Sequence, residues 1–457
     1  MTKRTTSTYH LISLGCAKNL VDSESMAQLL NRQGYSPTEY PEEAEFLIVN
    51  TCGFLRTSRD EAINILTDLA SIKMPWQKLI AAGCMTELHR QEILDSVPGV
   101  DGLLGTRRWM DIVDVIKETD KKRRQIPYSY FPEVSTVGVD EKNTYRAAIQ
   151  GGSAYLKIAD GCRRPCAYCL IPLIKGGLVS RPAERILEDA RALEDRGINE
   201  IILIAQDLTD YGHDLGIKDG LPILLEKMVK AVPSIPWIRL MYTFPGYVTP
   251  QLVDLMASEP QILPYLDMPL QHAEPEILKS MRRPSDMTHV LDTLLGLRQR
   301  IPEVALRSTF IVGYPGEDDA SFGKLLDFIK AAQFDHLGAF TYSFEPGSPA
   351  EPLGDPISED EKIDRLETLM QVQAEISLKR NQAFIGKTMQ VLVEGVDEEN
   401  RISIGRSYRD APEIDGLVVI EDLAPVGEFV QVQINSAITH DLIGRLVTDT
   451  DASQTAS

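Results

Sequence analysis

The sequence predicts an α/β protein of three parts: an N-terminal doubly wound parallel sheet, an incomplete (β/α) barrel and a small all-β barrel at the C-terminus. Three observations support this fold class. Short apolar runs alternate with segments of helical periodicity up to about residue 120, which is typical of parallel sheets. The same alternation resumes at Ala154 and lasts to about Phe340. After Lys387 the period changes to short Val- and Ile-rich runs between Gly, Asp and Pro.

Length and charge limit the kind of protein. A chain of 457 residues is long enough for about three domains. No apolar run approaches the ~18 residues of a membrane span, and the basic start from Met1 to Thr8 leads into a strand-like run rather than a signal peptide. We therefore expect a cytoplasmic protein with no membrane contact. The net charge of −20 argues against broad contact with nucleic-acid phosphates and favours a basic partner, although an acidic surface that only aids solubility explains it equally well.

In the N-terminal part, three cysteines follow three predicted strands. The strands are expected at His10–Leu14, Phe46–Val49 and Leu79–Ala82, with a fourth at Leu103 and Leu104, and the helices at Ser23–Leu30, Arg59–Leu69, Glu87–Leu94 and Trp109–Ile116. Cys16, Cys52 and Cys84 each lie just past the carboxyl end of a strand, the edge where open α/β sheets bind ligands. We predict that these three thiolates hold an iron–sulfur cluster. A single cysteine at such a place would more simply be a small buried hydrophobe.

A change of character from Thr119 to Gln150 marks a boundary between domains. Lys121–Arg124 form a basic run, and the residues after it lack clean periodicity, so we expect a linker over 121–147. The basic run either touches a nucleic acid or forms a solvated face of this linker.

The second part is expected to contain six βα units. Its strands are expected at Ala154–Ala159, Ile201–Ala205, Trp237–Met241, Tyr265–Met268, Ser308–Val312 and Leu337–Tyr342. Ser180 and Pro182 form a plausible cap and first-turn pair for the first helix, and the amphipathic segment Ser358–Ala383 is expected to close the domain. In such barrels the active-site residues come from the carboxyl ends of the strands.

The loop after the first of these strands contains Cys162, Cys166 and Cys169 in a C-x3-C-x2-C spacing. Thiolates suit iron–sulfur clusters or zinc, but a structural zinc site needs four ligands and this loop has no fourth Cys or His. Three thiolates on a cubane cluster leave one iron open for a substrate. Three reduced cysteines that merely pack are the alternative, and Arg163 and Arg164 make this a poor core segment.

Polar groups at other strand ends are candidates for binding a cofactor. Gln206 and Asp207 follow one strand, Gln271 and His272 follow another, and Gly313–Glu317 follow a third. Such groups can hydrogen-bond a ribose or a carboxylate, and glycine lets the backbone approach a ligand closely. Packing at the barrel rim and a sharp turn are the alternatives, and a lone histidine is more simply a scaffold residue than a metal ligand. The predicted cofactor-binding residues are Tyr168, Gln206, Gln271, Gly313 and Glu317. Tyr168 is a candidate to present its backbone to an adenine, with simple loop packing as the alternative.

The third part is expected to contain strands at Met389–Val393, Leu417–Ile420 and Phe429–Ile434, followed by a polar, disordered tail over 449–457. Between Lys387 and Val447 it has five Lys and Arg against eleven Asp and Glu, a net charge of −6. A domain that grips RNA should neutralise phosphates, so this acidity favours a basic protein as the partner.

Several motifs together resemble the radical S-adenosylmethionine (SAM) methylthiotransferases. They are SLGCAKN from Ser13 to Asn19, NTC from Asn50 to Cys52, AGC from Ala82 to Cys84, the C-x3-C-x2-C loop, FIVGYPGE from Phe310 to Glu317, and the terminal β domain. The resemblance spans about Tyr9 to Val447. It implies an N-terminal methylthiotransferase domain (9–120), a radical SAM domain (148–384) and an OB-like TRAM domain (385–448) that grips the substrate.

The resemblance also implies the chemistry. Each cysteine triad would hold one [4Fe–4S] cluster, and we assign no catalytic residue beyond the clusters. The cluster on Cys162, Cys166 and Cys169 would cleave SAM to a radical that removes hydrogen from an unactivated C–H bond. The cluster on the other triad would supply sulfur, a second SAM would supply the methyl group, and an electron donor such as a flavodoxin or ferredoxin would reduce the barrel cluster, although the sequence does not reveal which donor.

Two branches of the family differ in substrate: a tRNA adenosine, or the β-carbon of an aspartate in ribosomal protein S-twelve. The stretch SLGCAKNLVDSE from Ser13 to Glu24 and the segment Gly405–Gly416 resemble the protein branch. The acidic third part favours the same branch, with tRNA as the alternative and nucleic-acid contact as secondary. Arg406 and Arg409 are expected to be exposed loop charges, which either touch RNA near the target or need no role.

One segment departs from the family pattern. A loop of small residues and arginine usually follows the third cysteine, but this chain has Pro172–Gly177 there. The resemblance therefore does not determine how the substrate approaches this loop. Two other function classes also fit some features. A two-cluster electron carrier explains the cysteines but neither Gly313–Glu317 nor the β domain, and a non-catalytic ribosome-binding factor would not need Cys162.

Overall fold

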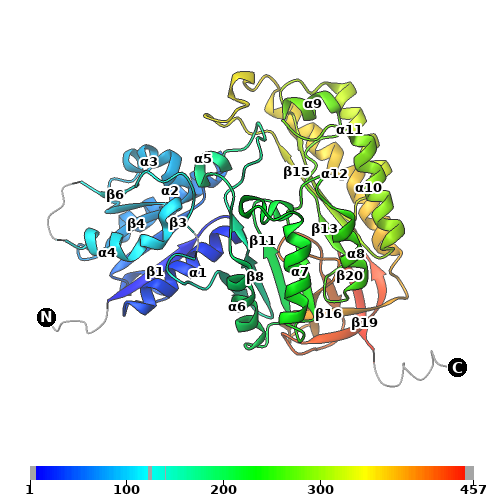
Figure 1. The fold of residues 1–457 in the computed structure, drawn as a ribbon, viewed down its shortest axis with the longest axis horizontal. Coiled ribbons are helices and arrows are strands. Elements are labelled where there is room, and N and C mark those ends of the chain that lie inside the picture. The colour runs from blue at the N-terminus through cyan, green and yellow to red at the C-terminus, as the bar shows by residue number, and fades with distance from the viewer. Residues whose placement is uncertain (1–6, 122–125, 139, 448–457) are drawn as a thin grey trace.

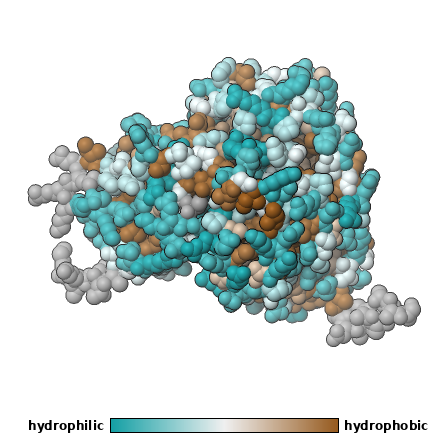
Figure 2. Space-filling view, in the orientation of Figure 1, coloured by the Kyte–Doolittle hydropathy of each residue, from teal (hydrophilic) through white to brown (hydrophobic). Residues whose placement is uncertain are grey.

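The computed structural model describes residues 7–121, 126–138 and 140–447. Figure 1 shows an N-terminal α/β domain in blue and cyan, a larger α/β barrel in green and yellow, and a small β barrel in red beneath it. Most of the basic run Lys121–Arg124, and the tail 449–457, lie outside the described residues. No helix within the described ranges is long and apolar enough to cross a membrane. In Figure 2 the visible face is mostly hydrophilic, with apolar side chains gathered near its middle, where the N-terminal domain meets the barrel.

The N-terminal domain is a doubly wound parallel sheet, as predicted. Its strands, in the order β2-β1-β3-β4-β5-β6, are β1 Thr8–Ser13, β2 Ser36–Pro37, β3 Phe46–Thr51, β4 Lys78–Gly83, β5 Gly102–Gly105 and β6 Tyr128–Tyr130. Its helices are α1 Ala17–Arg32, α2 Arg56–Ile72, α3 Cys84–Ser96 and α4 Ile112–Thr119, with 3-10 turns at Pro41–Glu43 and Thr106–Asp111. Successive strand residues point to opposite faces, so Ile48 joins one core with α1 and α4, and Leu47 joins another with α2 and α3. The short strand β6 lies in the region expected to be a linker, and its pattern did not predict a strand.

The second unit contains all six predicted strands. The strands are β7 Ala147–Gln150, β8 Ser153–Lys157, β11 Glu200–Ile204, β12 Trp237–Leu240, β13 Tyr265–Asp267, β14 Ala305–Val312 and β15 His336–Thr341, and a small ladder joins β9 Ala159–Asp160 to β10 Val179–Ser180. The helices are α5 Ile171–Lys175, α6 Ala183–Glu194, α7 Gly220–Ala231, α8 Pro250–Ser258, α9 Pro275–Ser280, α10 Met287–Arg300, α11 Asp319–Ala332 and α12 Glu359–Gln382, with 3-10 turns at Leu208–Asp210, His213–Leu215 and Glu351–Leu353. The sheets β12-β11-β8-β7 and β13-β14-β15 are linked by one bridge between Ile238 and Ile262. The result is the expected incomplete barrel, with β7 as an antiparallel edge strand.

One predicted helix cap is wrong. Ser180 is not the cap of α6, because its backbone pairs with Ala159 in the β9–β10 ladder and its hydroxyl accepts a hydrogen bond from the Gly212 N–H at 2.9 Å. Pro182 takes the capping position instead, one residue before the helix starts. The predicted helix over Ser358–Ala383 is present as α12, and the Ser358 side chain caps it by accepting from the Glu361 N–H.

The third unit is a closed barrel in the order β16-β17-β18-β20-β19. Its strands are β16 Thr388–Asp397, β17 Ile402–Ser407, β18 Val418–Ile420, β19 Phe429–Ala437 and β20 Leu442–Leu446. Two of them, β17 and β20, were not predicted, because glycine interrupts their apolar pattern. These glycines allow close strand crossings: a Cβ at Gly405 would lie 2.3 Å from the Leu392 carbonyl oxygen, and one at Gly444 would lie 2.3 Å from that of Gln433.

This small barrel is fixed to the amino ends of the large barrel's strands. Arg406 lies 2.6 Å from Glu200, the first residue of β11, and Arg409 lies 3.2 Å from Asp335, which precedes β15. Both arginine side chains are about 1% exposed. The expectation that they are exposed loop charges is therefore wrong, and the segment that contains them anchors one domain to another.

Candidate active site

Cys162, Cys166 and Cys169 line a cavity of about 130 Å³ at the carboxyl ends of the barrel strands. The loop that contains them follows β9 and ends at α5. The cavity is lined by Cys162, Arg164, Cys166, Tyr168, Cys169, Ile171, Gln206, Asp207, Tyr242, Thr243, Phe244, Pro269, Gln271 and Arg283. The position agrees with the rule that such barrels place their active sites at this end.

The surroundings of these thiols suit a cluster of iron and sulfur. The N–H of Arg164 donates to Cys162 Sγ and the N–H of Ile171 donates to Cys169 Sγ, each at 3.4 Å, and Arg283 Nη1 lies 3.8 Å from Cys166 Sγ. Burial raises the pKa of Cys162 to about 11 and that of Cys169 to about 12. The thiols alone would therefore stay protonated at neutral pH, and a bound metal would displace their protons. The donated hydrogen bonds and the guanidinium would then stabilise the anionic sulfurs.

Three of the five predicted cofactor-binding residues, Tyr168, Gln206 and Gln271, line this cavity. Gly313 and Glu317 do not. The Glu317 carboxylate is fully buried, accepts from the Gly313 N–H at 3.0 Å, and lies 2.9 Å from both Arg365 and His272. In the described structure it closes the turn after β14, and His272, hydrogen-bonded to it, is a scaffold residue.

The sequence did not single out Tyr242, Phe244 or Arg283, which also line the cavity. Tyr242 has a φ of 65° and Gln271 a φ of 79°, both in the left-handed region that side chains other than glycine rarely adopt. Strained residues of this kind cluster at functional sites. Tyr242 follows β12 at its carboxyl end, so its position was a signal that sequence reasoning could have used.

The second triad lies at the carboxyl edge of the N-terminal sheet. Cys16 precedes α1, Cys52 follows β3 directly, and Cys84 is the first residue of α3 after β4. Burial raises the pKa of Cys84 to about 12, and both Cys16 and Cys52 are close enough to raise it further. Two motif residues hold the loops together. The Asn19 amide donates to the carbonyl of Leu14, and the Asn50 amide donates to that of Asn19, at 2.7 and 3.0 Å.

The thiol of Cys16 differs from the other two. It is exposed. Neighbouring protein atoms oppose its ionisation, but the Lys18 cation and the backbone N–H of Asn19 lower its pKa below the usual range. Gly15, with a φ of 85°, permits the approach of this loop to β3, because a Cβ there would lie 2.7 Å from Cys52 Cβ.

In the part of the chain that the structure describes, no three Cys, His, Asp or Glu side chains gather closely enough to hold a single metal ion. A [4Fe–4S] cluster makes a different demand, because each thiolate binds a separate iron and the ligands stand further apart. All six cysteines are free, three at each site. The donor sets therefore fit clusters.

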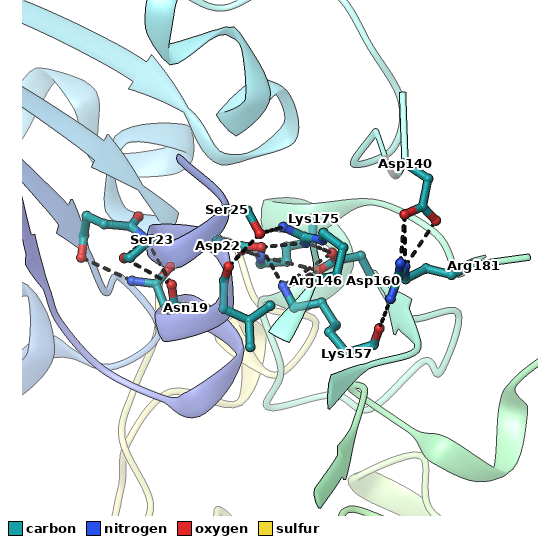
Figure 3. Close-up of polar contacts among 12 residues, drawn as sticks. Asn19, Asp22, Ser23, Ser25, Asp140, Arg146, Lys157, Asp160, Lys175 and Arg181 are labelled. Atoms are coloured by element: carbon teal, nitrogen blue, oxygen red, sulfur yellow. Dashed lines mark hydrogen bonds and ion pairs between the residues drawn. The ribbon is translucent and has the colours of Figure 1, made fainter. Parts of the chain in front are cut away.

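A buried network of charges joins the N-terminal domain to the barrel (Figure 3). Asp22 of α1 lies 2.6 Å from both Arg146 and Lys157 and 2.8 Å from Lys175, and all four side chains are at most 2% exposed. Burial opposes the ionisation of Asp22, but Lys157, Lys175 and Arg146 hold its pKa far below the usual range. Asp160 lies within 3.4 Å of the same three cations. The network fixes the N-terminal domain against the barrel.

Helix α5 lies between the two triads. It starts two residues after Cys169 and packs against α3, which begins with Cys84 (Figure 1). Its last residue, Lys175, partly offsets the rise that burial causes in the pKa of Cys84 and contributes to the lowered pKa of Cys16. On the other side, Lys18 Nζ lies 3.3 Å from the centre of the Tyr242 ring, and Tyr242 lines the cavity. The segment Pro172–Gly177, which departs from the family pattern, thus contributes to the wall between the sites.

Comparison with protein families agrees with the three units. Residues 8–105 match Uncharacterized protein family UPF0004, residues 156–329 match the Radical SAM superfamily, and residues 385–447 match the TRAM domain.

Curated relatives match nearly the whole chain. A protein of Chloroflexus aurantiacus named ribosomal protein uS12 methylthiotransferase RimO is 46% identical over 452 residues, which cover 95% of this chain and 99% of the relative. Proteins of the same name from Roseiflexus sp. and Geobacter sulfurreducens are 44% and 40% identical, each over 96% of this chain and 97% and 98% of their own. Among solved structures, the radical SAM methyltransferase TsrM of Kitasatospora setae has the same fold over 76% of this chain and 77% of its own, with a TM-score of 0.56 at 14% identity.

Proposed function

We propose a function for this chain on the premise that it belongs to the radical SAM methylthiotransferase family, together with the uS12 methylthiotransferases that match it over nearly their whole length. Membership makes it a SAM-dependent transferase that uses iron–sulfur chemistry. The function that we propose is the addition of a methylthio group to the β-carbon of an aspartate in ribosomal protein uS12, the S-twelve protein of the expected branch.

The observation that best supports this proposal is the contact of the two cysteine sites across one wall. Lys18, two residues from Cys16, stands over Tyr242, whose ring lines the cavity of Cys162, Cys166 and Cys169. A substrate carbon that enters beside this wall would be within reach of both sites. An enzyme that activates a carbon at one site and adds sulfur from another needs this arrangement.

We assign one [4Fe–4S] cluster to each triad. When bound, the cluster in the barrel would supply the electron that cleaves SAM, and the N-terminal cluster would supply the sulfur. The protein's own residues hold these groups in place. Arg283 and the N–H groups of Arg164 and Ile171 stabilise the thiolates, and Tyr168, Gln206 and Gln271 line the space beside them where SAM would bind. The network around Asp22 keeps the two sites at a fixed separation.

The charge of the terminal domain supports a protein substrate. Its net charge is −6, and two of its five cations, Arg406 and Arg409, are buried in ion pairs. Two of its carboxylates, Asp410 and Asp415, are buried as well, so the accessible surface keeps this acidic balance, which repels phosphates and attracts a basic ribosomal protein. We further propose a cytoplasmic enzyme that receives electrons from a flavodoxin or ferredoxin.

The test is anaerobic reconstitution with iron, sulfide, SAM and reductant, with uS12 and tRNA offered side by side. We expect uS12 to gain the mass of one methylthio group less the hydrogen that it replaces, and the enzyme to bind about eight irons, as two [4Fe–4S] clusters require. Mass gain on tRNA alone would overturn the proposed substrate, and binding of only one cluster would overturn the assignment of the triads. Cluster binding without SAM cleavage would favour an electron carrier. Unchanged ribosome binding by a Cys162→Ala variant, with no modification by the wild type, would favour a binding factor.

A further inference from the structure

Among the residues that the structure describes, four lysines are buried: Lys18, Lys157, Lys175 and Lys362. Three of them have two carboxylate partners each. Lys157 and Lys175 pair with Asp22 and Asp160, and Lys362 pairs with Asp355 and Glu359. Lys18 has no carboxylate within ion-pair distance in the described ranges, although it is only 8% exposed. It is the exception among the buried lysines.

A buried ammonium without an anion is costly, because it loses its hydration without compensation. Lys18 stands over the aromatic face of Tyr242, with 3.3 Å from Nζ to the ring centre. A cation–π contact recovers part of the lost hydration but leaves the charge unneutralised. Tyr242 is itself held in a left-handed conformation, where its N–H donates to Asp267 at 3.0 Å. Asp267 is in turn paired with Arg307, so it does not neutralise the charge of Lys18.

The position of Lys18 indicates what kind of anion would neutralise its ammonium group. It extends from the first turn of α1, next to Cys16, to a ring that lines the cavity of the other triad. Any group that binds beside both sites meets this cation. The β-carbon of an aspartate is bonded directly to its carboxylate carbon, so a cation that binds the carboxylate places the reacting carbon one bond away.

We propose that Lys18 binds the side-chain carboxylate of the aspartate that is modified, and so selects this residue and places its β-carbon between the two cysteine sites. The proposal rests on the proposed function. Asparagine has the same shape but no charge, and would leave the ammonium unneutralised. The same lysine also lowers the pKa of Cys16, so a role confined to the N-terminal cluster is the competing explanation.

The test measures binding rather than turnover. The protein, reconstituted with its clusters and supplied with SAM but no reductant, is titrated anaerobically with uS12 and with uS12 in which the modified aspartate, located by mass spectrometry, is replaced by asparagine. We expect the wild type to bind the aspartate form about 10- to 100-fold more tightly, as for a hydrogen bond between charged groups. Lys18→Met should bind both forms equally weakly, and Lys18→Arg should restore part of the preference. Lys230→Met, a change of an exposed lysine on α7, should behave as the wild type.

Equal binding of the two forms by the wild type would overturn the inference without any variant. A Lys18→Met variant that keeps the preference for aspartate would also overturn it, and iron content and the spectrum of the N-terminal cluster would then show whether Lys18 serves that cluster alone. If Lys18→Met fails to bind its clusters, the wild-type and Lys18→Arg measurements decide. Failure of the wild type to modify uS12 at all would instead overturn the proposed function, so the two failures are distinguishable.

Discussion

Both ends of the large barrel contain buried ion pairs, among them Arg164 with Asp207 at the carboxyl end, but the two ends differ in the groups that lack a partner. At the amino end, buried cations meet buried carboxylates: Glu200 lies 2.6 Å from both Arg239 and Arg406, and Asp335 pairs with Arg409. At the carboxyl end, the chain is strained at Tyr242 and Gln271, three thiols share a cavity, and Lys18 has no carboxylate partner in the described residues. The charged groups at the amino end neutralise one another without a ligand. The groups at the carboxyl end need a bound ligand to complete their interactions.

This difference indicates where substitutions should affect stability and where they should affect chemistry. In (β/α) barrels the amino face contributes stability and the carboxyl face contributes catalysis. The chain extends this division to its neighbours, because the terminal barrel is attached to the first face and the N-terminal domain to the second.

The largest effect is expected from a change of the cysteine site in the barrel. Cys162→Ala removes one of three thiolates, and cleavage of SAM to 5′-deoxyadenosine should fall by at least ~10³-fold because no side chain can replace the cofactor chemistry. Chromatography of the products gives the rate. Cys16→Ala is the matched control, and it should keep SAM cleavage while it loses methylthiolation. Equal loss of cleavage in both variants would contradict separate roles for the two triads.

At the amino end, Arg406→Ala should lower stability and spare chemistry. It leaves the fully buried Glu200 with one partner fewer, so we expect the free energy of unfolding to fall by about 3 kcal/mol. SAM cleavage per mole of folded protein should be unchanged. Arg445→Ala, which breaks an exposed pair with Glu421, should cost under about 1 kcal/mol. A stable Arg406→Ala protein with a raised KM for its substrate would show that this arginine touches the substrate after all.

Stability should also depend on pH through Glu200. Burial opposes its ionisation, but Arg239 and Arg406 together lower its pKa from 4.5 to about 2. A carboxylate whose pKa is lower in the folded than in the unfolded state contributes stability above the unfolded value, and this is lost as the pH falls from about 4.5 toward 2. The contribution is about 3 kcal/mol. Denaturant unfolding between pH 5 and 3 should therefore show a smaller loss for Glu200→Gln than for the wild type, measured side by side. Parallel curves would contradict the assignment.

The smallest functional effect is expected at Glu317. Its carboxylate is enclosed by Arg365, His272 and the Gly313 N–H. Glu317→Gln should cost about 1–3 kcal/mol of stability and leave the SAM dissociation constant within about twofold. Gln206→Ala, at a residue that lines the cavity, is the comparison and should weaken SAM binding. A tenfold weaker SAM affinity in Glu317→Gln would restore its predicted role as a cofactor ligand.

Local patterns were enough to predict much of this molecule. The strands of both parallel sheets follow from apolar runs, and both cysteine triads follow from their positions after strands. The sequence could not show which charges are buried. Arg406 and Arg409 were expected to be exposed loop charges because their partners, Glu200 and Asp335, lie far away in the chain. The unpaired state of Lys18 and the left-handed backbone of Tyr242 are likewise products of tertiary packing, which no local pattern encodes.

The placement of the aspartate between the two sites is tested most directly with uS12 labelled with deuterium at the β-carbons of its aspartates. With that carbon beside the barrel cavity, deuterium should appear in the 5′-deoxyadenosine that accompanies methylthiolation. Lys18→Met should lower this transfer more than it lowers SAM cleavage. Modified uS12 with no deuterium in 5′-deoxyadenosine would contradict the placement of the aspartate between the two sites.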